Sequence, residues 1–477
     1  MSARYLTTTL PYVNADPHVG FALEIVQADV LARTWRANGD EVFFSTGTDE
    51  HGQKVYDAAK KASQEPQTYV DHYASEFQKM KTALNLSNDT FVRTTSSSQV
   101  NAAQEMWRRC DAKGDIYKKT YSGLYCVGCE SFKTEKELVN EKCHEHPSLS
   151  LEKISEENYF FRFSKYQDRL LAYLKREYSV VPEWRRKEAI AFVKGGLEDF
   201  SISREKKRLS WGIPVPGDST QVMYVWFDAL TNYISTLGWP KDSEGKFKKF
   251  WEEGKTLQVA GKDQVRFQSL MWQAMLMSAE IKNTDQIFYH GFINSGGQKM
   301  SKSLGNVISP YELVKKYGTD ATRYVLLRHV HPFEDSDITW ERLDEWYTAD
   351  LVNGLGNLVA RVMQMASQYL DSPVDLSDRR KPIPVQRQIE KFEFNNAMVA
   401  IWSDISIIDE LIQKEKPFEI FKTEKEKARR RVTYYVKELS KIAELLQPFV
   451  PETSEKICRA ITENKKPDNL FPRLLTD

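Results

Sequence analysis

The sequence of 477 residues has little of what marks several protein classes. Five cysteines are too few for a disulfide scaffold, and 67 basic and 67 acidic side chains cancel, so net charge neither indicates nor excludes a nucleic-acid partner. No apolar run is long enough to span a bilayer, and the N-terminus MSARYLTTTLPYVN lacks the apolar core of a signal peptide. We therefore expect a cytoplasmic protein of about two to four domains, with no membrane partner.

Strand and helix patterns alternate along much of the chain, which predicts an α/β fold with a parallel sheet. A Thr-rich strand pattern at 4–9 precedes apolar residues at helical spacing that end at Gly39, and EVFFS at 41–45 predicts the next strand. The alternation breaks between about 113 and 224, which indicates an inserted module. From about Leu343 onward only helical periodicity remains, so a C-terminal helical bundle is expected.

Two short strings are suited to handling phosphates. Pro17-His18-Val19-Gly20 lies between the first predicted strand and a helix, where a helix N-terminus binds anions, Gly20 admits a phosphate and His18 can donate to it. Alone, this string is more often just a turn. Lys299-Met300-Ser301-Lys302-Ser303 lies in a glycine-rich loop, where two lysines can follow the charge of a triphosphate during transfer.

A third string predicts a metal site. Cys126-x-x-Cys129 is followed by Cys143-x-x-His146, which is the spacing of a tetrahedral zinc knuckle. His144 is an alternative fourth ligand, although the C-x-x-H spacing favours His146. With four protein ligands the zinc would be structural rather than catalytic, one ion per chain.

Together, these strings and their neighbours resemble a known family. The first two resemble the HIGH and KMSKS signatures of class I aminoacyl-tRNA synthetases. From Tyr5 to about Phe418 the chain resembles the methionyl-tRNA synthetase family, in its single zinc-knuckle form. The matching strings are LPYVNADPHVG, TGTDEHG, YCVGCESF, GGLEDFSISR, WGIPVPGD, YVWFDALTNY, AGKDQVRF, HGFINSGGQKMSKSLGN and GLGNLVAR.

The resemblance implies a fold and an activity. We expect a Rossmann-type catalytic domain in two halves, residues 1–112 and 225–342, with the KMSKS loop in the second half. A connective insertion with the zinc knuckle would occupy 113–224, and a helical anticodon-binding domain 343–477. Such a chain would activate methionine with ATP, accompanied by Mg²⁺, to methionyl-adenylate and transfer it to the 3′ end of tRNA. It ends without the extra C-terminal domain of some relatives, so we expect a monomer.

The resemblance also implies site residues. Asp49 would hold the substrate ammonium, and aromatic walls would suit the thioether. The residues expected around methionine are Leu10, Tyr12, Asp49, Trp226, Ala229, Tyr233, Gln264 and Gln268. Those expected to bind ATP are His18, Gly20, Glu24, Gly261, Asp263, Lys302 and Ser303. His18, Lys299 and Lys302 would be catalytic.

In the helical region, the resemblance implies a face that reads the anticodon. Asn357 and Arg361 lie four apart, on one helix face, and match family residues with that role. Phe418 follows a proline where the family often has tryptophan, and its ring can still stack on a base. The basic clusters at 185–187 and 429–431 would be solvated faces or phosphate contacts.

Three positions depart from the family pattern. Phe21 stands where the HIGH signature ends in histidine, while Gln264 and Gln268 replace an apolar residue and a histidine near the pocket.

A synthetase for leucine or cysteine is disfavoured by the aromatic pocket and by the lack of room for a large editing domain. A paralogue that only binds tRNA is disfavoured by His18, Asp49 and the intact KMSKS string.

Overall fold

The computed structural model describes residues 2–128, 131–133, 138–144, 146–300, 305–379, 382 and 385–474. The chain forms two compact units. The first comprises residues 1–17, 38–79 and 88–290, and the second comprises 18–37, 80–87 and 291–477. In these described ranges, no helix is both long and apolar enough to cross a membrane.

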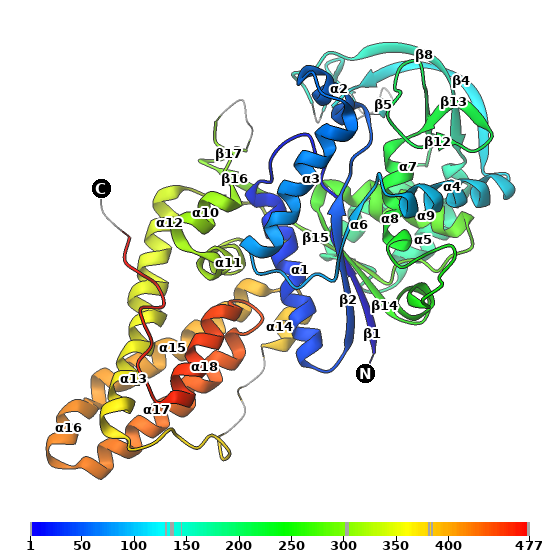
Figure 1. Cartoon of the computed structure of the whole chain (residues 1–477). Helices are drawn as coiled ribbons and strands as arrows, with labels where there is room; N and C mark the ends of the chain where they lie inside the picture. Colours follow the sequence, from blue (N-terminus) through cyan, green and yellow to red (C-terminus); the bar gives the residue numbers. More distant parts are fainter. Residues whose placement is uncertain are drawn as a thin grey trace. The chain divides into compact units, whose positions relative to one another are not determined.

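A six-stranded, wholly parallel sheet organises the first unit (Figure 1). Its strands in spatial order are β3 (Thr90–Arg93), β2 (Glu41–Thr48), β1 (Ala3–Thr7), β14 (Lys255–Gly261), β15 (Gln286–His290) and β9 (Val180–Val181). Tyr5 and Leu6 at its centre are fully buried, as the strand-forming, apolar composition of β1 requires. The predicted parallel α/β sheet is thereby confirmed.

The order of the strands reverses direction between β1 and β14, at the centre of the sheet. β1 pairs with β2 on one side and with β14 on the other, both parallel to it. At such a reversal of strand order, the connections diverge beyond the carboxyl ends and leave a crevice where ligands bind. Asp49 and Lys262 come directly after β2 and β14, and Tyr12 lies in the connection that follows β1.

Helices and smaller sheets complete the first unit. The helices are α2 (Gln53–Lys61), α3 (Pro66–Ala83, whose last turn belongs to the second unit), α4 (Ser97–Ala112), α5 (Gln167–Lys175), α6 (Glu183–Lys194), α7 (Val225–Leu230), α8 (Asn232–Ser235) and α9 (Trp272–Ser278). One antiparallel sheet has the order β10 (Phe200–Ser201), β8 (Glu152–Phe161), β4 (Ile116–Cys126), β5 (Ser131–Lys133). Another has β11 (Ser203–Glu205), β13 (Asp218–Met223) and β12 (Pro214–Val215), and a short pair joins β6 (Leu138–Val139) to β7 (Lys142–Cys143).

The second unit is mainly helical, which confirms the predicted C-terminal bundle. It contains α1 (Val19–Ala37), α10 (Pro310–Tyr317), α11 (Thr319–Arg328), α12 (Trp340–Trp346), α13 (Asn357–Tyr369), α14 (Gln386–Glu390), α15 (Phe394–Glu415), α16 (Pro417–Thr423), α17 (Lys425–Leu446) and α18 (Pro451–Glu463). Its small sheet has the order β17 (Gln298–Lys299), β16 (Ile293–Ser295), β18 (Ser336–Ile338). The helices α15, α17 and α18 each bury apolar residues that recur at helical spacing along one face.

A buried ion pair ties α1 to the rest of the second unit. Arg323 of α11 lies 2.8 Å from Asp29 of α1, and both side chains are wholly buried. The guanidinium also donates to the carbonyl oxygens of Leu84, Pro448 and Phe449. Burial by itself raises the pKa of Asp29, but the neighbouring arginines and hydrogen bonds outweigh it and hold the pKa below its ordinary value of 3.8. Asp29 is therefore charged at neutral pH.

Arg323→Met is expected to lower the free energy of unfolding of the second unit by about 3–5 kcal/mol, because it leaves the Asp29 carboxylate buried without its partner. Since the pKa of Asp29 is depressed, the stabilisation is complete above pH 3.8 and is lost as pH falls through the lower, folded-state value. The difference in the free energy of unfolding between Arg323→Met and the unsubstituted protein should therefore become smaller in acid. Denaturant unfolding measures it, with Arg429→Met as control, since Arg429 pairs with an exposed Asp371. Equal losses in both variants would contradict the role of burial.

Candidate functional site

The turn after β2 brings Asp49 beside the loop that follows β1. The amide of Asp49 donates to the carbonyl of Pro11 at 2.9 Å, and the amide of Val13 donates to the carbonyl of Asp49 at 3.2 Å. These bonds form an isolated parallel bridge between Tyr12 and Asp49. Asp49 is thereby held at the carboxyl end of the sheet with its side chain buried, and its backbone is paired with that of Tyr12.

Three rings form one wall beside this bridge. Trp226 stacks on Phe267 with ring centroids 3.8 Å apart, and Tyr12 meets the edge of Trp226 at 6.2 Å. Ala229 and Tyr233 follow Trp226 on α7 and α8 and are buried, whereas Leu10 and Tyr12 are half-buried. Such a wall suits an apolar or thioether side chain.

The two glutamines that depart from the family behave differently. Gln268 is 1% exposed, and its amide donates to the Tyr233 hydroxyl at 2.5 Å. Its Oε1 is buried with no hydrogen-bond partner among the described residues. Gln264 instead donates to Asp263 at 3.2 Å on the surface. Gln268 is therefore bonded to Tyr233 in the interior of the first unit, while Gln264 is turned toward the adjacent carboxylate.

Several residues at this site were missed by the sequence analysis. Phe267 completes the aromatic wall, and His51 bonds to Asp228 at 2.6 Å within the same region. All three lie inside strings that match the family, AGKDQVRF, TGTDEHG and YVWFDALTNY. For His51, the sequence did contain a signal: Asp49-Glu50-His51 is a run of three ionisable residues, and such residues require partners where they are buried.

The residues expected to bind ATP are divided between the two units. His18, Gly20 and Glu24 belong to the second unit, and Gly261 and Asp263 to the first. The amide of Gly20 donates to His18 Nδ1 at 3.1 Å, so the neutral ring carries its proton on Nε2. A Cβ at Gly20 would lie 2.9 Å from Cε1 of this ring, so a larger residue would displace the exposed imidazole from its present position. Glu24 is buried within α1, while His18 and Asp263 are exposed.

The KMSKS string is described only at its start. Lys299 ends β17, and its backbone pairs with Asn294 of β16. Ser301, Lys302 and Ser303 lie outside the described residues. The hairpin of β16 and β17 thus ends shortly before the predicted phosphate-binding residues in the sequence.

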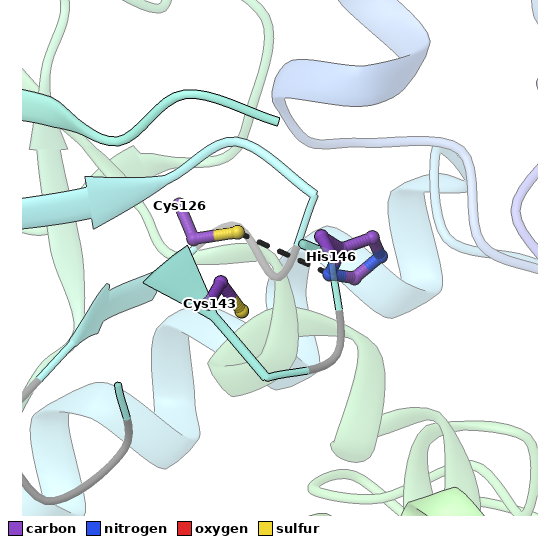
Figure 2. Close-up of side chains that lie close together, drawn as sticks. All are labelled: Cys126, Cys143 and His146. Atoms are coloured by element: carbon purple, nitrogen blue, oxygen red, sulfur yellow. Dashed lines mark hydrogen bonds between the residues drawn. The ribbon is translucent and has the colours of Figure 1, made fainter. Parts of the chain in front are cut away.

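The predicted metal ligands converge where they are described (Figure 2). One ligand atom each from Cys126, Cys143 and His146 lie within 4.8 Å of one another, and Cys126 Sγ is 3.9 Å from His146 Nδ1. Zinc bonds of about 2.0–2.3 Å put tetrahedral ligands roughly 3.5–3.8 Å apart, so this group could hold a metal. Cys129 lies outside the described residues, and His144 is exposed and outside the cluster.

The anticodon candidates lie in the bundle. Asn357 begins α13 and is exposed, and Arg361 follows one turn later. Arg361 forms an ion pair of 2.5 Å with Asp409 of α15. Phe418 is 45% exposed at the start of α16. The three residues are thus at least partly accessible from solvent.

The two basic clusters are largely neutralised. Arg185 pairs with Glu188 and Arg186 with Glu183. In the second cluster Arg429 pairs with Asp371, and Arg431 approaches Glu415 at 3.4 Å. Ion pairs of this exposed kind are typical of a solvated face.

Comparison with known proteins identifies two family models that match the chain. The model described as tRNA synthetases class I (M) matches residues 4–150 and 136–363. The model described as the anticodon binding domain of methionyl tRNA ligase matches residues 375–473. Most of the chain is covered by these matches.

Individual relatives agree over nearly the whole length. The methionine–tRNA ligase of Fusobacterium nucleatum is 40% identical, covering 98% of this chain and 75% of the relative. That of Rhizobium meliloti is 39% identical, covering 95% and 90%. A Mycobacterium tuberculosis methionyl-tRNA synthetase solved with methionyl-adenylate is 37% identical with a TM-score of 0.89, covering 96% of this chain and 93% of that one.

Gly128→Ala is expected to weaken metal binding, because the added Cβ would lie 2.5 Å from Cγ of His146 and displace the ring. A loss of about 10- to 100-fold in affinity is expected, as for other residues that orient a ligand. Competition with a chromogenic chelator measures it. Val127→Ala, in the same turn, is the matched control and should leave the affinity unchanged. An unaltered affinity in Gly128→Ala would show that the ring does not hold the metal.

Proposed function

The chain belongs to the methionine–tRNA ligase family of class I tRNA synthetases, and we propose that separate groups of its residues bind methionine, bind the nucleotide and read the anticodon. The activity follows from that membership: the chain uses ATP to convert methionine to methionyl-adenylate and transfers the methionyl group to its tRNA. The observation that supports these residue roles most is the backbone bridge that pairs the buried Asp49 with Tyr12, whose ring contacts Trp226.

In this proposal, the crevice after β1 and β2 selects methionine. Asp49 takes the ammonium group, as a buried carboxylate at hydrogen-bonding reach of a substrate cation should. Tyr12, Trp226 and Phe267 contact the thioether. The remaining pocket residues are Leu10, Ala229, Tyr233 and Gln268, with Gln264 at the margin. Gln268 acts through the Tyr233 hydroxyl to which it donates.

For ATP binding we propose, in the second unit, residues at the start of α1 and, in the first unit, residues at the end of β14. His18, with its proton on Nε2, donates to phosphate oxygen, and Gly20 allows the close approach of that ring. Glu24, Gly261 and Asp263 complete the nucleotide contacts, with Lys302 and Ser303 on the phosphates. Mg²⁺ would arrive with the ATP phosphates, which are its preferred ligands.

The reaction needs no nucleophile from the protein. The carboxylate of methionine attacks the α-phosphate of ATP, forming methionyl-adenylate and releasing pyrophosphate. The terminal ribose hydroxyl of tRNA then attacks the acyl carbon and AMP leaves. The chain contributes positioning of the two substrates and, through Lys299 and Lys302, stabilisation of charge on the phosphates.

The remaining expectations complete the proposal. The catalytic halves would span 1–112 and 225–342, the connective insertion 113–224 and the anticodon-binding domain 343–477. The site at Cys126, Cys129, Cys143 and His146 would hold structural Zn²⁺. The protein would act as a cytoplasmic monomer.

Lys302→Ala is expected to lower kcat for methionine-dependent ATP–pyrophosphate exchange by about 10²- to 10³-fold, because the ammonium stabilises charge that develops in the transition state. KM for methionine should change little. Lys315→Ala, at an exposed position of α10, is the control and should retain full activity. Equal losses in kcat and in methionine affinity, or no loss, would refute the assignment.

Metal analysis of the purified protein is expected to find about one zinc per chain. His146→Ala should lose this zinc, whereas His144→Ala should keep it, because His144 is exposed outside the cluster. Fully active protein without zinc would contradict the proposal.

Arg361→Ala is expected to weaken recognition of the methionine anticodon by about 1–3 kcal/mol if the guanidinium bonds a base edge. ATP–methionine exchange without tRNA should be unaffected. The comparison uses tRNAs with the methionine anticodon and with altered anticodons.

Asp409→Ala is the matched variant, since it breaks the same ion pair but keeps the guanidinium. It should preserve the preference for the methionine anticodon. If instead both variants lose thermal stability and neither changes the preference, Arg361 only bridges α13 and α15.

A further inference from the structure

Three consecutive ionisable residues are buried at the turn after β2. Asp49 is 2% exposed, Glu50 0% and His51 7%. Burying such groups is costly unless each is bonded, so their partners define what the turn is built to do. Glu50 accepts from Arg93 at 2.6 and 2.9 Å and from the hydroxyl of Thr48 at 2.8 Å. It is therefore fully engaged with the end of β3.

His51 points to a different element. Its Nδ1 lies 2.6 Å from Oδ2 of Asp228, which is 1% exposed on α7. A carboxylate accepts, so Nδ1 carries the proton and donates. Asp228 stands two residues after Trp226 and directly before Ala229, both of which the proposal places at the methionine side chain. The bond thus joins the turn of Asp49 to the helix of the aromatic wall.

Asp228 is held from the other side as well. The Gln99 amide of α4 donates to Asp228 Oδ1 at 2.9 Å and to its carbonyl oxygen at 2.7 Å. Ser235 of α8, two residues after Tyr233, donates to Gln99 Oε1 at 2.5 Å. The result is a buried chain of hydrogen bonds, His51–Asp228–Gln99–Ser235, in which each link has a donor and an acceptor.

The backbone of the turn is fixed by a further contact. Trp211 lies against the His51 ring with centroids 5.4 Å apart, and its indole N–H donates to the carbonyl of Glu50 at 2.6 Å. The turn therefore has little freedom to move independently of α7.

We infer that His51 is a positioning residue for methionine recognition, and that the His51–Asp228–Gln99–Ser235 chain sets the spacing between Asp49 and the aromatic wall. This inference rests on the proposed roles of Asp49 and Trp226. Methionine is a small ligand whose ammonium and side chain are recognised by groups on different elements, so an error in their spacing weakens binding at one end. Because the ammonium contact is the same before and during the reaction, loss of the chain raises KM without lowering kcat.

The test compares two substitutions of His51. His51→Leu removes the donor to Asp228, while the amide of His51→Asn can replace the Nδ1–H. In methionine-dependent ATP–pyrophosphate exchange, His51→Leu is expected to raise KM for methionine by about 10- to 100-fold, the effect of losing a hydrogen bond to a buried charge. Its kcat and its KM for ATP should stay within about threefold. His51→Asn should restore most of the methionine affinity.

A control separates positioning from stability. Asp115→Asn alters another buried carboxylate, bonded to Lys165 and Ser278 away from the pocket, and should lower the melting temperature without changing KM for methionine. If His51→Leu does not fold, Gln99→Met breaks the chain on the other side of Asp228 and should show the same split between KM and kcat.

The outcomes are distinct. Three results in a folded His51→Leu or Gln99→Met variant would overturn the inference. These are an unchanged KM for methionine, a fall in kcat alone, or an equal rise in KM for methionine and for ATP. Absence of methionine-dependent exchange in the unsubstituted protein would instead overturn the proposed function itself.

Discussion

The parallel pairing of β1 with both β2 and β14 is the constraint on which the proposed methionine site depends. It places the carboxyl ends of neighbouring strands together, so that Tyr12 and Asp49 meet although each is on a separate connection. The register has little tolerance, because a shift of one residue would exchange the two faces of a strand. Burial of Tyr5, Leu6 and Phe44 inside the sheet opposes such a shift.

Buried charge is the second recurring feature, and Asp29, Glu50 and Asp228 each have a basic partner. In the second unit Asp29 and Arg323 join α1 to α11 and to the turn between α17 and α18. In the first unit Glu50 pairs with Arg93, and Asp228 with His51. Such pairs add little net stability compared with apolar packing, but removing one partner is costly. They therefore fix the elements that carry the site in one arrangement, which is what preorganised recognition requires.

The sequence predicted the elements whose signal is local, and it did not predict partners that are distant along the chain. The strand at EVFFS, the helix with Asn357 and Arg361, and the convergence of Cys126, Cys143 and His146 follow from periodicity or fixed spacing. The bond between His51 and Asp228 spans 177 positions, and no pattern near either residue indicates the other. β9 has two residues, too few for a periodic signal, yet it joins the main sheet from within the stretch expected to be an insertion. For Gln268, tertiary packing decided that its amide bonds Tyr233.

Selection of methionine by the crevice after β1 and β2 is the central claim, and ATP–pyrophosphate exchange with single amino acids tests it most directly. The rings of Tyr12, Trp226 and Phe267 next to the buried Asp49 predict efficient exchange with methionine, and kcat/KM values for leucine and cysteine lower by at least about 100-fold. Exchange supported by leucine or cysteine as efficiently as by methionine would contradict this account of the pocket.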